Sequence, residues 1–143
     1  MIRALTAAAL LASIALAASA DEVWSLPSGN QIVYERDAGA TAILSYKPEV
    51  GLEAGYIFVP GLGGYYSGRG AYQGYWVEAA DAGPVCAASL VDAEGKTWQR
   101  WGIAEVKFQK PDFPSKITLK RGDCFGSAKQ KITAKPVVGA GIQ

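Results

Sequence analysis

The stretch QIVYERDAGATAILSYK, residues 31–47, decides the fold class of this chain. Apolar and polar side chains alternate on both sides of Asp37-Ala38-Gly39-Ala40, a short segment with a glycine suited to a tight turn. Alternation with a period of two is typical of a strand with one buried face. The stretch therefore predicts an antiparallel β-hairpin, with strands over residues 31–36 and 41–47.

The same rhythm continues along the rest of the chain. Short runs rich in β-branched and aromatic residues, such as 54–59, 72–78 and 117–121, are separated by Gly, Pro and Asp. After the first twenty residues, no long window has the apolar spacing of an amphipathic helix. The pattern predicts an all-β fold, a single-domain antiparallel sandwich or small barrel of about eight to nine strands.

The first twenty residues have the layout of a secretory signal peptide. Arg3 precedes an apolar run that ends in Ala18-Ser19-Ala20, a small-residue cleavage signal, and a charged pair follows. We therefore expect a periplasmic or secreted protein. No later apolar stretch approaches the ~20 residues that a membrane-spanning helix needs. The expected parts are a signal peptide over 1–20, a β domain over 21–136 and a flexible tail over 137–143.

The chain has two cysteines, Cys86 and Cys124, and both follow the expected cleavage site. An even pair of cysteines in an exported domain predicts a disulfide. Their spacing is not that of a C-x-x-C motif, and the sequence contains no histidine. Neither a redox motif nor a common metal site is therefore indicated, and no cofactor is expected.

The lack of histidine also limits the catalytic chemistry. It removes Ser-His-Asp and Cys-His catalysis, together with the side chain best suited to proton transfer near neutral pH. A pair of carboxylates, as used in glycoside hydrolysis, is the enzymatic route that remains. Glu53, Glu78 and Asp81 are the candidates for such a pair, because they lie near the aromatic segment of residues 56–76.

That segment, YIFVPGLGGYYSGRGAYQGYW, concentrates aromatic residues and glycines. Glycine lets the backbone turn sharply, and Tyr and Trp offer large rigid contact surfaces with a polar tip. We expect its middle to be an exposed loop with Tyr65, Tyr66 and Arg69 at the tip. Loops of this kind carry binding residues more often than cores do.

Aromatic residues also occur in the strands around this loop. For Tyr72 and Trp76, packing against the sheet is the alternative to binding, because aromatic rings often cover a glycine within a strand. Trp98 and Trp101 are three residues apart, so on one regular strand they would face opposite sides, with one in the core. The candidate binding residues are Tyr65, Tyr66, Arg69, Tyr72, Tyr75 and Trp76.

Charge is divided unevenly along the chain. Residues 21–95 carry three basic and ten acidic groups, whereas residues 96–143 carry ten basic and three acidic groups. A basic half can form a face that binds polyanions, but its charges are neutralised if strands from the two halves alternate. The sequence leaves both open. No recognised DNA- or RNA-binding motif is present, so nucleic acid is not an expected partner.

These features predict an exported, non-catalytic binding domain. Its expected partner is a protein or a glycan, engaged through the Gly/Tyr-rich segment, and an inhibitor of an extracellular enzyme is one form of such a domain. Two alternatives stay open at this point: a small carboxylate-dependent enzyme acting on glycans, and a structural protein of the cell envelope.

Overall fold

In a computed structural model, which describes residues 22–139, the chain forms a closed antiparallel barrel of eight strands. The expected all-β class is confirmed, and of the two architectures considered the chain adopts the barrel. The expected signal peptide and the end of the tail, residues 140–143, lie outside the described residues. The elements are β1 Val23–Ser25, β2 Gln31–Ala38, β3 Thr41–Tyr46, β4 Gly55–Pro60, β5 Ala71–Glu78, η1 Ala80–Ala82, β6 Leu90–Val91, β7 Thr97–Trp98, β8 Arg100–Phe108, β9 Ile117–Arg121 and β10 Gln130–Pro136.

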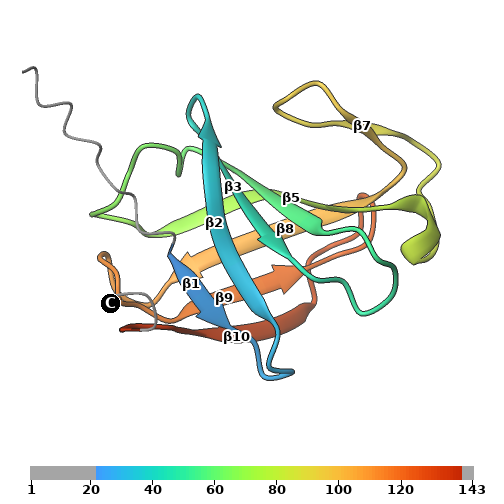
Figure 1. The fold of residues 1–143 in the computed structure, drawn as a ribbon. Coiled ribbons are helices and arrows are strands. Elements are labelled where there is room, and N and C mark those ends of the chain that lie inside the picture. Colours follow the sequence, from blue (N-terminus) through green and yellow to red (C-terminus); the bar gives the residue numbers. More distant parts are fainter. Residues whose placement is uncertain (1–21, 140–143) are drawn as a thin grey trace, which may run out of the picture.

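The barrel has an up-and-down topology, in the order β1-β10-β9-β8-β5-β4-β3-β2. Figure 1 shows β1 lying beside β10, where the first and last strands meet. Trp24 of β1 is paired with Ile32 of β2 and with Pro136 of β10, and this double pairing closes the sheet. Closure leaves no free barrel edge for another chain to pair with.

The predicted hairpin of residues 31–47 is confirmed as β2 and β3. Gly39 provides the turn with a φ of +59°, a left-handed conformation that glycine adopts without strain. A register shift between Tyr34 and Arg36 marks a bulge in β2. Bulges increase local bending and twist, which helps a sheet to close on itself.

Side chains of alternate residues fill the barrel interior. An eight-stranded barrel is just wide enough for this, so large and small residues must share the space. The indole of Trp24 is fully buried, and its Nε1 donates a hydrogen bond to the Ser115 carbonyl oxygen over 2.9 Å. The buried interior residues are Trp24, Ile32, Tyr34, Ala42, Leu44, Ile57, Val59, Leu62, Trp76, Ala104, Val106, Phe108, Ile117, Leu119 and Ala134.

A second apolar cluster lies outside the barrel, beneath the segment that connects β5 to β8. Trp98 from this segment and Trp101 of β8 are both buried there, on the outer faces of β3, β4 and β5. The prediction that these two tryptophans face opposite sides of one strand was wrong. The chain bends between β7 and β8, so the two residues do not follow one regular strand and can face the same cluster.

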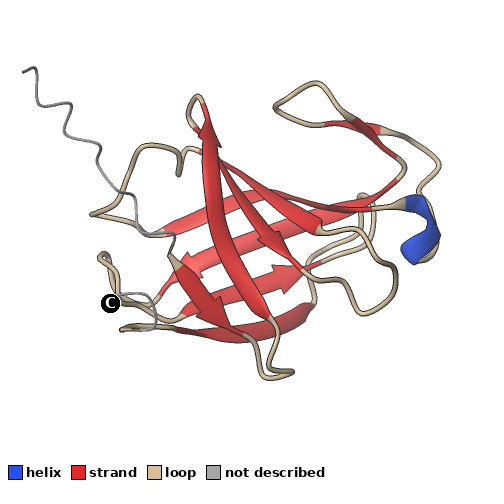
Figure 2. Cartoon of the chain, viewed as in Figure 1, coloured by secondary structure: helices blue, strands red, loops and turns tan. Residues whose placement is uncertain are grey.

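The disulfide predicted between Cys86 and Cys124 is present. It joins the β5–β8 connection to the loop between β9 and β10. The connection contains a single turn of 3-10 helix, η1, drawn in blue in Figure 2. Within residues 22–139, no helix has the length and apolar character to cross a membrane.

Substitution of Gly74 tests how tightly the barrel wall is packed. A Cβ on Gly74 would lie 1.9 Å from the Phe58 carbonyl oxygen, whereas a Cβ on Gly70 would have nothing within 4 Å. Gly74→Ala should therefore lower the free energy of unfolding by about 2 kcal/mol. Gly70→Ala, the matched control, should change it by less than about 0.5 kcal/mol. Urea unfolding of both variants checks this, and equal stabilities would contradict the packing described.

Candidate functional site

One end of the barrel opens into a cavity of about 310 Å³, which we call the barrel mouth. It lies where β5 ends and β8 begins, and the loops between β1 and β2, β3 and β4, and β9 and β10 surround it. Ile32, Ile57 and Leu119 provide apolar wall. Its aromatic side chains are those of Tyr46 and Trp76, and its charged residues are Lys47, Glu49, Glu78, Arg100, Lys120, Arg121 and Asp123.

Glu78 is the centre of the charged group in the mouth. Its side chain is 4% exposed, and it forms ion pairs with two arginines. The Nε of Arg100 donates to Oε1 over 3.2 Å, and the Nη2 of Arg121 donates to Oε2 over 3.0 Å. One carboxylate thus faces two guanidinium groups, which leaves this cluster with a net positive charge.

Trp76 is the platform for these arginines. The guanidinium carbon of Arg121 lies 3.6 Å from the centroid of its ring, and that of Arg100 lies 5.2 Å away. The indole Nε1 donates to the Gly122 carbonyl oxygen over 2.6 Å, which fixes the ring. Gly102 makes room for it, because a Cβ there would lie 2.4 Å from this Nε1.

Tyr46 completes the cluster. Its hydroxyl donates to Glu78 Oε2 over 2.7 Å and accepts from Arg121 over 3.4 Å. Burial raises the pKa of Tyr46 above its ordinary value, although the nearby Arg121 opposes this shift. The phenol therefore keeps its proton at physiological pH and remains a donor to the carboxylate. Gly55, its cross-strand partner, leaves space for the ring.

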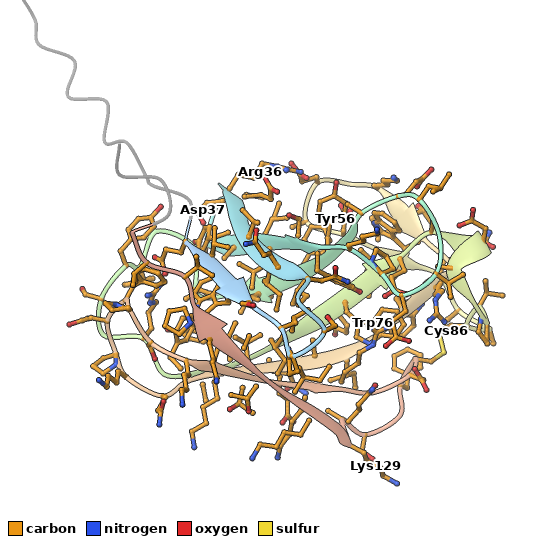
Figure 3. The ribbon with its side chains drawn as sticks, turned by 60° about the horizontal axis from the view of Figure 1, so that its bottom comes forward. Arg36, Asp37, Tyr56, Trp76, Cys86 and Lys129 are labelled. Atoms are coloured by element: carbon orange, nitrogen blue, oxygen red, sulfur yellow. A yellow bond between two sulfur atoms is a disulfide. The ribbon has the colours of Figure 1, made fainter. Side chains whose placement is uncertain are left out.

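Strand alternation and a hydrogen bond to a neighbouring segment position the arginines. Arg100 and Arg121 occupy inward positions at the ends of β8 and β9, in step with the buried residues Ala104 and Leu119. Arg100 also donates to the Pro84 carbonyl oxygen over 2.9 Å, which ties it to the β5–β8 connection. In Figure 3, Trp76 and the disulfide cysteine Cys86 lie toward the same end of the barrel.

The arrangement has unused hydrogen-bonding capacity. A guanidinium carries five N–H groups, and the hydrogen bonds described above use two from Arg100 and two from Arg121. Both side chains are partly exposed to solvent, at 16% and 25%. Guanidinium groups with free donors and a net positive charge, next to apolar walls, are suited to an anion that carries an apolar portion.

Of the six residues predicted to bind, Trp76 lies in the barrel mouth. Tyr65 and Tyr66 are in the loop between β4 and β5, where they are 61% and 51% exposed, as expected for a loop tip. Tyr75 is 40% exposed on the outer wall, with its ring packed edge-on against Trp101. Tyr72 is half-buried and packs edge-on against the interior residue Phe108.

The expectation that Arg69 is exposed was wrong, because its exposed fraction is 3%. Its Nη1 forms an ion pair with Glu22 over 2.8 Å, and its guanidinium lies over the Phe108 ring at 4.4 Å. Arg69 precedes β5, so it lies at the end of the barrel opposite the mouth. There it helps to close that end of the barrel. The six residues therefore do not share one surface.

Sequence reasoning singled out Glu78 for carboxylate chemistry, but its neighbours were missed. Glu53 and Asp81 are not among the residues lining the mouth. Arg100, Arg121 and Tyr46 were not recognised as site residues. The sequence did contain one signal for the arginines. Each lies at the end of a strand, an even number of residues from apolar residues that are expected to face the core.

Comparison of the chain with protein-family models, with curated proteins and with solved structures found no match. The fold and the site define an antiparallel barrel with a charged mouth.

Glu78 and Glu94 each pair with arginine, but we expect their substitution to lower the free energy of unfolding by very different amounts. Glu78→Gln removes the carboxylate that is ion-paired with both guanidinium groups, and should lower the free energy of unfolding by about 3 kcal/mol. Glu94→Gln removes the exposed partner of Arg36 and should cost less than about 1 kcal/mol. Urea unfolding at neutral pH measures both, and equal effects would show that Glu78 does not hold the arginines.

Proposed function

We propose that this protein is an exported binding protein whose barrel mouth takes a small anion with an apolar portion. The observation that carries the proposal is the charge of the mouth, because Arg100 and Arg121 share the one carboxylate of Glu78. Over its whole lining, the mouth has four basic and three acidic side chains, so one positive charge is in excess. A ligand carboxylate, phosphate or sulfate group would supply the missing negative charge. The planar guanidinium fork suits all three groups.

The size and rigidity of the mouth support this proposal. Its volume of about 310 Å³ lies at the lower end of the range for small-molecule sites. The arginines are already held in place by Glu78 and by stacking on Trp76, so little side-chain freedom is lost when a ligand binds. The apolar walls would enclose the uncharged part of the ligand.

Export and non-catalytic binding are also parts of the proposal. The Cys86–Cys124 disulfide supports export, because such bonds persist in oxidising compartments. The leader-like first twenty residues point the same way. The histidine-free composition supports binding rather than catalysis.

Isothermal titration calorimetry of the mature protein, residues 21–143, with phenyl phosphate and benzoate tests the mouth directly. Both anions should bind, and the neutral analogue benzyl alcohol should bind at least about tenfold more weakly because it lacks the charge-assisted hydrogen bonds. Arg121→Gln should weaken binding of the anions by about tenfold or more.

Arg36→Gln is the matched control for this experiment, because it removes one arginine from an exposed ion pair far from the mouth. It should leave the affinity unchanged. Circular dichroism of each variant checks that the barrel is intact. Equal binding of the anions and benzyl alcohol, or equal loss in the two variants, would contradict the proposed site.

A second candidate function is engagement of a protein or glycan partner through the loop between β4 and β5. One observation favours it: the loop is held in place although it presents two exposed tyrosines. Asp37 accepts a hydrogen bond from the Gly64 amide over 3.0 Å and is within 3.5 Å of the Tyr66 hydroxyl. Leu62 is fully buried and anchors the start of the loop. Rigid exposed aromatic residues are typical of binding hot spots.

Tyr65→Ala with Tyr66→Ala tests this second function. Pull-down from envelope extract with mature protein, followed by titration of the captured partner, should show a loss of affinity of about tenfold or more. Phe125→Ala removes an exposed ring, 75% exposed, from the loop between β9 and β10 and is the control. Unchanged affinity in the double variant would exclude the loop as the binding surface.

A further inference from the structure

The basic second half of the sequence gathers on one outer wall of the barrel. Strands β8, β9 and β10 are neighbours, so their outward-facing lysines lie on a continuous surface. The acidic first half does not interleave with them there. In Figure 3, nitrogen-tipped side chains project along the lower side of the barrel, on the same side as the labelled Lys129.

These strands border a groove of about 720 Å³, which we call the basic groove. It is open to solvent, and of the residues that the structure describes it shares only Lys120 with the barrel mouth. Among the described residues that line it, Glu105 is the single acid. The groove is lined by Ala71, Tyr72, Gln73, Glu105, Val106, Lys107, Gln109, Lys116, Thr118, Lys120, Lys131 and Thr133.

The strand register places two of these lysines in direct opposition. Lys120 of β9 is the cross-strand partner of Lys131 of β10. Like charges directly opposite each other destabilise a sheet. Glu105 of β8 is the cross-strand partner of Lys120 on its other side, but the two side chains form no ion pair. Within the described residues, no lysine of the groove forms an ion pair. An unresolved local conflict of this kind is expected at functional positions.

Polar uncharged side chains lie between the charges. Lys107 is paired with Thr118, and Thr118 with Thr133, so a row of two hydroxyls runs across the groove beside the lysines. Gln73 and Gln109 add amide groups. Lysines can neutralise acidic groups of a ligand, while hydroxyls and amides can donate to and accept from its hydroxyl groups.

We propose that the basic groove binds an acidic polysaccharide, a chain of sugars that carry carboxylate or sulfate groups. The alternation of positive charges with hydroxyls and amides matches a ligand that alternates acidic groups with sugar hydroxyls. This site is independent of the barrel mouth and needs no contact with the Gly/Tyr-rich loop.

Two other polyanions fit the groove less well. Single-stranded nucleic acid is bound by stacking its bases on exposed aromatic rings, but Tyr72, the aromatic residue of the groove, packs against Phe108 inside the barrel. Binding to a membrane surface usually combines basic residues with apolar side chains that insert between lipids. Among the described residues, the large exposed hydrophobic side chains all lie outside the lining of the groove.

Binding of the mature protein to polygalacturonate and heparin fragments, measured by calorimetry at low and physiological salt, tests this proposal. Both should bind, more weakly as salt screens the lysines, and neutral dextran should not. Lys107→Gln with Lys131→Gln should weaken binding by about tenfold. Arg36→Gln with Lys96→Gln removes the same charge outside both cavities and outside the wall formed by β8, β9 and β10, and should change the affinity by less than twofold.

Thermal unfolding of the two double variants separates binding from folding. Removing Lys131 relieves its opposition to Lys120, so the groove variant should be at least as stable as wild type. Equal loss of affinity in the two variants, or no binding of either polysaccharide, would overturn the proposal. Tighter binding to single-stranded DNA, or to vesicles of phosphatidylcholine and phosphatidylglycerol, would assign the groove to a different polyanion.

Discussion

The ion pairs between Glu78 and two arginines are the interaction on which the barrel mouth depends. Charges taken out of water are costly, and a buried ion pair contributes little net stability unless its geometry and hydrogen bonds are good. Here both carboxylate oxygens accept hydrogen bonds, Tyr46 adds a third, and Trp76 supports the guanidinium groups. The arrangement therefore holds two positive charges in fixed positions beside the apolar wall residues Ile32, Ile57 and Leu119.

Both ends of the barrel have ion pairs between arginine and glutamate, but the number of arginines for each carboxylate differs. At the end opposite the mouth, one arginine, Arg69, pairs with one carboxylate, Glu22, and its side chain has no exposed surface. At the mouth, two arginines share one carboxylate and remain partly exposed. A balanced buried pair helps to close the barrel, whereas an unbalanced, accessible group can receive a ligand. The outer wall shows a third case, in which the lysines of the basic groove are exposed and form no ion pair within residues 22–139.

Local sequence patterns predicted most of the fold but only part of the site. Alternation and turn residues identified the β2–β3 hairpin, and cysteine parity identified the disulfide. We expected Arg69 to be exposed because its glycine-rich surroundings indicate a loop. In the closed barrel, however, Glu22 pairs with it and the Phe108 ring packs against it. The alternation of residues along β8 and β9 does predict that the side chains of Arg100 and Arg121 face inward. That they meet Glu78 follows from which strands are neighbours, and this long-range information is not present in any short stretch of sequence.

A crystal structure of residues 21–143, soaked in selenate, tests the central claim most directly. Selenate is a tetrahedral anion, and the anomalous scattering of selenium identifies its position. We expect a selenium peak in the barrel mouth, within hydrogen-bonding distance of Arg100 and Arg121, with both arginines still paired to Glu78. A mouth that holds no selenate at a concentration that fills surface sites, or arginines that point away from Glu78 into solvent, would contradict the account.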